Sequence, residues 1–248
     1  MRTDRELFDA NRRFYDALWM DLRLVDPERF NTWPLLSALA AQSPRRLEIG
    51  PGLRPRLPVS GTCFVDISAP ALARLRDRGA TTVLASAMSL PFPDAAFDLV
   101  CAFDIVEHLE DDDRALAELS RVAVPGRALV LSVPLHPGHW TAFDDLVGHR
   151  CRYDPGQLLA KLAEHGLTVE RSAAYGMQPR ASWLVALGAW WLTHRHEEAM
   201  WWCNRVIMPL GLWLEKKLAW APGMIATERV DEILLVCRKA GTLVGAPA

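Results

Sequence analysis

Short apolar segments that alternate with amphipathic helical patterns constrain the fold of this 248-residue chain more than any other feature. The short segment 46–49, in which Leu47 and Ile49 are apolar, is expected to be a buried strand and runs directly into the turn Gly50-Pro51-Gly52. A second such segment, 62–65, ends at Asp66, and Ser68 is then suitably placed to cap the helix that follows. A strand–loop–helix unit that repeats in this way predicts an α/β fold, in which a doubly wound, mainly parallel sheet carries helices on both faces.

The same alternation continues along the rest of the chain. Further strands are expected at 82–84, 97–102, 128–133, 167–171 and 232–237, and helices at 33–41, 113–122 and 155–165. Pro125-Gly126 is expected to form a turn before the strand at 128–133. Counting the two segments described first, the pattern predicts a seven-stranded, Rossmann-like sheet.

Two segments lie outside this alternation. Residues 4–24 place apolar side chains, Tyr15 and Trp19 among them, on one helical stripe, which predicts an N-terminal helical lid. Residues 177–229 contain seven of the ten tryptophans, and charged residues interrupt their apolar runs before the roughly 20 residues needed to span a bilayer. This segment is therefore expected to be a helical insertion. The expected boundaries are 1–45 for the lid, 46–176 for the core, 177–229 for the insertion and 230–240 for the closing strand of the core.

Charge and cysteine content narrow the range of partners. The net charge is −2 at pH 7, so the chain lacks the basic character of a general nucleic-acid binder, and no nucleic-acid partner is expected. The five cysteines have no CxxC spacing and no histidines have a convincing metal-ligand spacing, so no metal is expected. The first 16 residues lack the apolar core of a signal peptide, which favours a cytoplasmic location.

Two acidic residues flank the glycine turn. Glu48 precedes Gly50 and Gly52, and Asp66 closes the next strand. Glycine allows a ligand to approach the backbone closely, the helix that follows offers free N–H groups, and a carboxylate at the end of the second strand suits two ribose hydroxyls. The order of these residues is typical of a site for a nucleotide-type cofactor.

Five groups of motifs follow one another in a fixed order. They are Leu47-Glu48-Ile49-Gly50-Pro51-Gly52, then Asp66, then Leu90-Pro91-Phe92-Pro93-Asp94 with Phe97-Asp98-Leu99-Val100, then Glu107-His108-Leu109, and finally Arg121-Val122 with Pro125-Gly126. This order resembles that of the class I S-adenosylmethionine-dependent methyltransferases, and within them the small-molecule branch (methyltransferase type 11) with ubiquinone- and menaquinone-biosynthesis enzymes. The resemblance covers roughly residues 46–153 and 232–237. It implies that S-adenosyl-L-methionine is the cofactor and that a small or lipid-like molecule accepts the methyl group.

The resemblance also implies a cofactor site in several parts. Glu48, Gly50 and Gly52 would face the methionyl group and Asp66 the ribose, while Ala85, Ser86, Ala87 and Met88 would line the adenine. Ile67 and Phe103 are also expected to bind the cofactor. Two positions depart from the family pattern. Arg54 stands in place of the usual third glycine, and Ser86 stands in place of the usual adenine-reading aspartate.

The acceptor site is expected beside the segment from His136 to Tyr153, at the edge where acceptors bind in such folds. Its end is similar to a Gly-His-x-Arg-Arg-Tyr signature, with Cys151 in place of the first arginine. His149 and Tyr153 are candidates to position or deprotonate an acceptor hydroxyl, and Asp104 is a candidate to face the methyl-transfer cavity. The residues expected to contact the acceptor are Tyr15, Trp19, His136, Asp144 and Arg152.

Two other functions remain compatible with these residues. A nicotinamide-dependent oxidoreductase also uses a Gly-x-Gly turn and an acid on the second strand, and the departures at Arg54 and Ser86 leave room for a non-catalytic cofactor-binding or membrane-associated scaffold. The tryptophan-rich insertion must bury its faces against the core, a second subunit, an apolar substrate or a membrane surface. Lys216 and Lys217 follow Trp213 closely, which favours an apolar or lipid-linked acceptor. Peripheral membrane contact and a homodimer through the insertion are both open alternatives.

Overall fold

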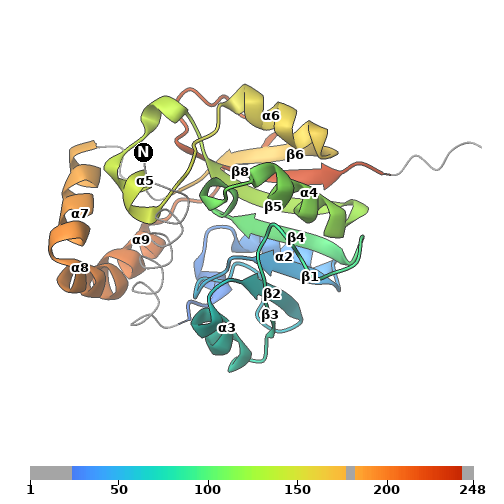
Figure 1. The fold of residues 1–248 in the computed structure, drawn as a ribbon, viewed down its shortest axis with the longest axis horizontal. Helices are drawn as coiled ribbons and strands as arrows, with labels where there is room; N and C mark the ends of the chain where they lie inside the picture. Colours follow the sequence, from blue (N-terminus) through green and yellow to red (C-terminus); the bar gives the residue numbers. More distant parts are fainter. Residues whose placement is uncertain (1–23, 177–181, 242–248) are drawn as a thin grey trace, which may run out of the picture.

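The computed structural model describes residues 24–176 and 182–241, and its centre is one eight-stranded sheet (Figure 1). The strands are β1 (Arg46–Ile49), β2 (Thr62–Asp66), β3 (Thr81–Leu84), β4 (Phe97–Phe103), β5 (Ala123–Pro134), β6 (Leu167–Ala174), β7 (Ala221–Pro222) and β8 (Glu232–Lys239). Their order in the sheet is β3-β2-β1-β4-β5-β8-β6-β7. Strands β1 to β5 pair in parallel, while β8 pairs antiparallel with β5 and β6.

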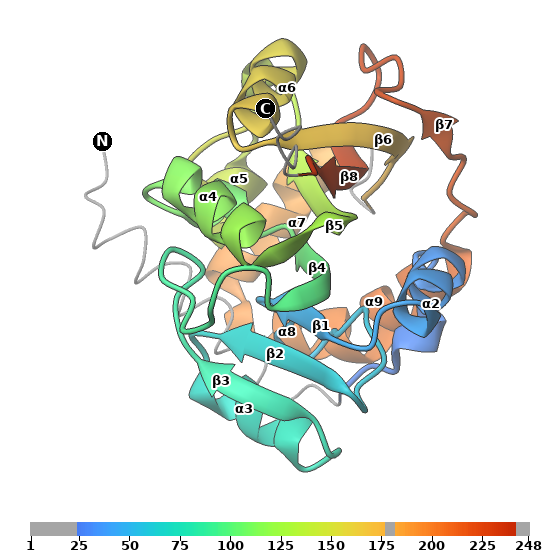
Figure 2. The same cartoon turned by 90° about the vertical axis from the view of Figure 1, so that its right-hand side faces the viewer.

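The helices connect the strands and cover both faces of the sheet (Figures 1 and 2). The α-helices are α2 (Trp33–Ala41), α3 (Ala69–Arg76), α4 (Asp112–Val122), α5 (Ala142–Val147), α6 (Pro155–Glu164), α7 (Ser182–His194), α8 (His196–Trp202) and α9 (Met208–Leu214). Short 3-10 helices are η1 (Pro27–Arg29), η2 (Val106–His108) and η3 (Pro137–His139), and η4 (Cys203–Ile207) is a π-helix. The expected lid residues Tyr15 and Trp19 lie outside the described residues.

Alternate side chains of the central strands form two separate apolar layers. On one face, Leu47 and Val100 pack with residues of α4 and α6, such as Leu119 and Leu158. On the other face, neighbouring strand residues such as Leu99 pack with α2, while Phe64 of β2 packs with α3. Both faces of the central strand β4 are therefore buried, which explains why its sequence is almost continuously apolar.

The predicted fold class is confirmed, and two details differ from the prediction. The sheet has eight strands instead of seven, because β7 consists of two residues and leaves no hydrophobic pattern to detect. Pro125-Gly126 does not precede the fifth strand but lies within β5, which begins at Ala123. Gly126 has φ +76°, and the register between β4 and β5 shifts near this end, so the strand accommodates the two residues as an irregularity instead of ending there.

The sheet order places a topological switch point between β1 and β4. From β1 the chain builds outward to β2 and β3, then returns to β4 on the other side of β1. The loops after β1 and β4 meet at this point, where a Cβ placed on Gly50 would lie 2.0 Å from the Cδ1 atom of Ile105. Ligands of doubly wound sheets bind in the crevice at such a point.

The helices of the insertion lie beside this same edge of the sheet. Leu53, which follows the glycine turn, packs in one apolar cluster with Leu192 of α7 and Ala199 of α8, and Leu146 of α5 joins them. Figure 1 shows α5, α7, α8 and α9 gathered at one end of the strands. The insertion thus covers part of the edge at which a cofactor and an acceptor are expected. Within the described part of the chain, no helix combines the length and apolar character needed to cross a membrane.

Candidate functional site

The turn after β1 is shaped by backbone conformation and by the carboxylate of Glu48. Gly50 and Gly52 have φ values of +66° and +51°, a region that favours glycine. The Glu48 side chain is buried, and its two oxygens accept backbone N–H bonds from Arg56 (2.9 and 3.1 Å) and Leu57 (2.8 Å). Burial raises the pKa of Glu48 to about 7, although these donors act in the opposite direction. Glu48 therefore anchors the loop, and its contact with a cofactor stays a prediction.

Asp66 holds the glycine turn against the end of β2. Its Oδ2 atom accepts the Gly52 N–H at 3.0 Å, and its Oδ1 atom accepts the Ser68 N–H at 2.8 Å. Ser68 also caps α3, as predicted, by accepting the Ala71 N–H at 3.4 Å. Asp66 therefore joins the glycine turn to the start of the next helix, and its expected contact with the ribose stays a prediction.

The positions expected to contact the adenine surround the ends of β2 and β3. Ile67 follows the Asp66 carboxylate directly and is 51% exposed, so it offers an apolar surface on which a flat base can lie. The hydroxyl of Ser86 accepts the Met88 N–H at 3.2 Å, while Ala87 is buried. Phe103 is also buried and packs in the core layer that contains α2, so its expected contact with the cofactor stays a prediction.

Acidic side chains gather where β4, β5 and β8 meet. Asp104 follows β4 with φ +52° and accepts the Ser132 hydroxyl at 2.6 Å. The pKa of Glu232 is well above its usual range because of burial and of the neighbouring Asp104 carboxylate. Glu107 is fully buried, and among the described residues its two carboxylate oxygens have no hydrogen-bond partner. Burial, followed by the negative charge of Asp104, raises the pKa of Glu107 well above its usual range.

Asp144, His149 and Arg152 form one buried network opposite Glu107. The Asp144 Oδ1 atom accepts His149 Nδ1 at 2.8 Å, and Arg152 donates to both Asp144 oxygens at 2.9 and 3.0 Å. The backbone N–H and the hydroxyl of Thr141 also donate to Asp144. Burial acts to raise the pKa of Asp144, but the bonds from His149, Arg152 and Thr141 outweigh it and lower the pKa below the usual range.

The expected contact of Asp144 and Arg152 with the acceptor stays a prediction, and the geometry favours a structural role for both. Their side chains are 0% and 2% exposed, and Arg152 donates to both Asp144 oxygens and to the Leu135 carbonyl. Their effect is to orient His149, because an Nδ1–H bonded to Asp144 leaves the Nε2 atom as the lone-pair nitrogen. That atom lies 3.9 Å from the Oε1 atom of Glu107.

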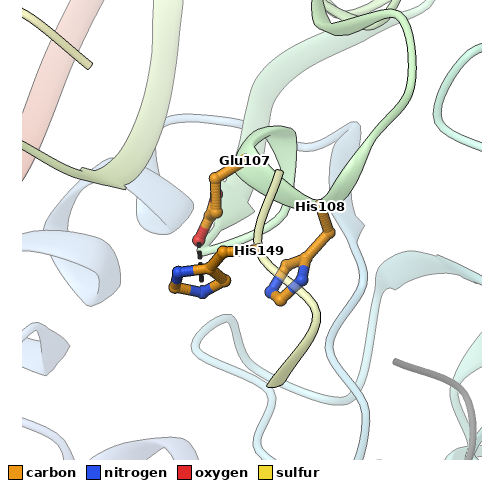
Figure 3. A group of neighbouring side chains, drawn as sticks. All are labelled: Glu107, His108 and His149. Carbon is orange, nitrogen blue, oxygen red and sulfur yellow. Dashed lines mark ion pairs between the residues drawn. The ribbon is translucent and has the colours of Figure 1, made fainter. Parts of the chain in front are cut away.

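His108 joins Glu107 and His149 in a compact group (Figure 3). Its Nδ1 atom lies 3.4 Å from the carbonyl oxygen of Gly148, and its ring centroid is 4.6 Å from that of His149. Burial, followed by the proximity of His149, lowers the pKa of His108 to about 3, so the ring is neutral at physiological pH. His108 belongs to the Glu107-His108-Leu109 motif, and no local pattern in the sequence connects it with His149, 41 positions later.

The remaining acceptor candidates bind protein atoms. The Tyr153 hydroxyl donates to Asp112 of α4 at 2.7 Å, and burial raises the pKa of this tyrosine, so it is poorly suited to deprotonate an acceptor. His136 bonds the Thr227 carbonyl at 2.7 Å through its Nε2 atom. Both proposed roles stay predictions, and the geometry favours structural ones.

Comparison with known proteins is consistent with this geometry. Residues 53–131 match the family model described as a methyltransferase domain. Demethylmenaquinone methyltransferase from Thermus thermophilus is 37% identical over 92 residues, and tRNA (carboxymethyluridine(34)-5-O)-methyltransferase from Arabidopsis thaliana is 29% identical over 130 residues. These matches cover 34% and 49% of this chain and 42% and 31% of the two relatives, so the chain spans less than half of either relative.

A solved S-adenosylmethionine-dependent methyltransferase from Thermotoga maritima superposes with a TM-score of 0.56 at 15% identity, and the match covers 95% of this chain and 93% of that one. This likeness shows that the two proteins share a fold, and the match of residues 53–131 identifies a methyltransferase domain in this part of the chain. The domain match favours S-adenosylmethionine as the cofactor over the nicotinamide-dependent alternative.

Proposed function

We propose that the protein transfers the methyl group of S-adenosylmethionine to a hydroxyl oxygen of a small or lipid-like acceptor. The observation that carries this proposal is the position of His149. Asp144 orients the imidazole ring through its Nδ1 atom, so the ring can interact with an acceptor hydroxyl through Nε2. Glu107 and His149 lie on the β4 and β5 side of the switch point.

Contacts around the glycine turn support the cofactor half of the site. Asp66 and Gly52 are joined at the end of β2, and the exposed Ile67 follows them. In the proposed reaction, Asp66 holds the ribose hydroxyls and Ile67 packs against the adenine. The acceptor oxygen then approaches the methyl carbon from the side of Glu107 and His149, and much of the rate comes from this alignment.

The acceptor class is inferred from the surface of the insertion. Large apolar side chains are exposed along α7, α8, η4 and α9; they are Leu187, Trp190, Trp201, Trp202, Val206, Ile207, Leu210, Trp213 and Leu214. Trp213 is 78% exposed and is followed by the exposed pair Lys216 and Lys217. Such a surface favours an apolar acceptor delivered from an anionic membrane surface. The net charge of −2 argues against RNA as the acceptor, although one relative is a tRNA methyltransferase by name.

The proposal is tested by replacing Asp66 with Asn. The loss of a charge-assisted contact with the ribose should weaken S-adenosylmethionine binding by about thirtyfold, which corresponds to about 2 kcal/mol. Calorimetry measures the affinity, and circular dichroism checks that the fold is intact. Asp77→Asn is the matched control, because Asp77 is an exposed acid at the end of the helix that follows.

Methyl transfer itself is measured as release of S-adenosylhomocysteine with three acceptor pools: lipid extract, small polar metabolites and bulk tRNA. Release with the lipid extract and loss of turnover in His149→Ala are the expected results. Unchanged cofactor affinity in Asp66→Asn would contradict the proposed cofactor site. Turnover with tRNA alone would contradict the acceptor class.

A further inference from the structure

Glu107 places a carboxylate in the interior of the protein, next to two histidines. Its side chain is 1% exposed, and within the described residues neither oxygen has a hydrogen-bond donor. An isolated buried carboxylate is costly by several kcal/mol unless a partner compensates it. The nearest recorded basic atom, His149 Nε2, is 3.9 Å from Oε1, which is too far for a hydrogen bond.

The two histidines beside Glu107 are arranged as metal ligands are. One ligand atom from each of Glu107, His108 and His149 lies within 4.8 Å of the other two. Around a tetrahedral ion with bonds of about 2.1 Å, such atoms are about 3.4 Å apart, so movements of about 1 Å complete the site. Figure 3 shows the three side chains together, two from the segment after β4 and one from the loop after α5.

Hydrogen-bond acceptors beside the Nδ1 atoms orient both rings for this role. Ligating histidines usually donate their other ring N–H to a carboxylate or a carbonyl, which fixes the tautomer. Here His149 donates Nδ1–H to Asp144 at 2.8 Å, and Nδ1 of His108 faces the Gly148 carbonyl at 3.4 Å. Arg152 in turn clamps Asp144 with two bonds. The Nε2 atom of His149 is therefore the lone-pair nitrogen of its ring, 3.9 Å from the Glu107 Oε1 atom, and the His108 ring lies beside it.

We infer that Glu107, His108 and His149 bind one divalent transition-metal ion, of which Zn²⁺ is the best representative. Two imidazole nitrogens and one carboxylate suit a borderline first-row ion better than Mg²⁺ or Ca²⁺, which prefer oxygen ligands. Three protein ligands leave at least one coordination position for another molecule. This arrangement of two histidines and one glutamate with an open position is typical of catalytic zinc sites rather than structural ones.

The open position gives the ion a role in methyl transfer, and this step rests on the proposed function. An acceptor hydroxyl that binds the ion loses its proton to water more readily, because the ion stabilises the alkoxide or phenolate. The oxygen lone pair then forms the new O–CH₃ bond while the S–CH₃ bond breaks, and S-adenosylhomocysteine leaves as a neutral thioether. His149 would act as a ligand in this reaction and not as a free base.

Metal binding is tested on the tag-free full chain after removal of metals by a chelator. Titration calorimetry with Zn²⁺ should give one ion per chain, and Co²⁺ should produce the visible absorption of a four- or five-coordinate nitrogen–oxygen site. Mg²⁺ at the same concentrations should give no saturable signal. His108→Ala, His149→Ala and Glu107→Gln should each weaken Zn²⁺ binding by at least a hundredfold, and Asp144→Asn by ten- to a hundredfold.

His139→Ala is the matched control. His136 and His139 form a second histidine pair with ring centroids 4.9 Å apart, and His139 bonds Asp231 at 2.8 Å, but the His139 side chain is exposed. Its loss should leave Zn²⁺ affinity unchanged. Absence of a one-to-one Zn²⁺ signal, or equal weakening by His139→Ala, would overturn the inference.

Calorimetry of the same metal-free chain with S-adenosylmethionine separates the metal site from the proposed function. Cofactor binding without Zn²⁺ binding rejects only the metal site. Zn²⁺ binding without cofactor binding rejects only the proposed methyl transfer.

Discussion

At the scale of single residues, Glu107 and Asp144 illustrate two opposite ways to bury a carboxylate. Asp144 accepts bonds from a histidine, an arginine and a threonine, so its charged form is stabilised. Glu107 has no such donors among the described residues, so its charged form is disfavoured. Proteins retain an uncompensated acid mainly where function requires it, at some cost in stability.

This contrast predicts a pH-dependent gain in stability for Glu107→Gln in the metal-free protein. The folded-state pKa of Glu107 lies above its unfolded value. The protonated side chain therefore makes its full contribution to the free energy of unfolding below about pH 4.5, and this contribution is lost as the pH rises and the carboxyl group ionises. The variant should match the natural protein at pH 4.5 and equal or exceed its free energy of unfolding at pH 8. Urea denaturation at several pH values measures this, with the exposed Glu110→Gln as the control. A loss of more than about 1 kcal/mol at pH 8 would mean that Glu107 has a structural partner.

The Asp144 carboxylate predicts the opposite pH dependence. Its folded-state pKa is lowered, so the stability it contributes is present above its unfolded pKa of about 3.8 and is lost as the pH falls further. Asp144→Asn should cost about 3 to 5 kcal/mol at pH 7, because it leaves Arg152 as a buried charge without a carboxylate. Denaturation at pH 7 and pH 3 should show the difference between the two proteins shrinking at the lower pH. A difference of equal size at both values would contradict the ion-pair explanation.

At the scale of elements, the turn after β1 depends on the loop after β4. Gly50 combines a positive φ with the approach of the Ile105 side chain, whereas Gly79 combines φ +83° with open space around its Cα. Gly50 is therefore required both by its backbone conformation and by the packing of Ile105. Gly79 is required by its backbone conformation alone.

Alanine substitutions at these two glycines should separate the effects. Gly79→Ala should cost about 1 to 2 kcal/mol for the left-handed conformation, and Gly50→Ala about 1 to 3 kcal/mol more for overpacking against Ile105. Thermal and chemical denaturation measure both values. The double variant of Gly50→Ala with Ile105→Ala should be more stable than the sum of the single effects, since the clash is removed. Additive losses would show that the two loops do not depend on one another.

At the scale of the whole molecule, the insertion joins the cofactor edge to an exposed apolar surface. Leu192 and Ala199 pack against Leu53 beside the glycine turn, while Trp213 and Leu214 of α9 remain exposed. One face of the insertion is therefore core, and another is available for an apolar partner. A molecule bound at the exposed face would lie near the edge of the sheet at which the proposed acceptor reacts.

Liposome flotation tests this surface. The natural protein should float with vesicles that contain anionic lipid, and binding should fall as salt is raised, because Lys216 and Lys217 contribute about 1 kcal/mol each near the headgroups. Replacing Trp213 by Ala and Leu214 by Ser should weaken binding at least tenfold. Trp140→Ala is the control, since Trp140 is exposed beside η3 and outside the insertion. Size-exclusion chromatography distinguishes the alternative: a dimer that dissociates on the same substitutions, without vesicle binding, would make the surface a subunit interface.

The sequence by itself determined the fold class, most strand positions and the order of the cofactor motifs. Period-two and period-3.6 apolar patterns are local, and so are the glycines with positive φ and the Ser68 cap, so each can be recognised within a few residues. The two-residue β7 was not predicted, because its pairing with β6 is specified by tertiary contacts rather than by its own composition. Pro125-Gly126 was placed in a turn for the same reason, since paired neighbours hold it within β5.

Only the tertiary structure decided which polar residues act together. Glu107 and His108 lie 41 or more positions from His149 in the sequence. Aspartate and arginine side chains are exposed in most proteins, but Asp144 and Arg152 are buried against one another. Sequence analysis therefore assigned Asp144 and Arg152 to the acceptor and expected no metal, because ligand spacing along the chain reveals a site only when one local element supplies the ligands. The physical reason is that burial and convergence depend on how distant segments pack. The Glu107 carboxylate is buried, and its charge is costly in free energy, only because the segment after β4 packs beside the loop after α5.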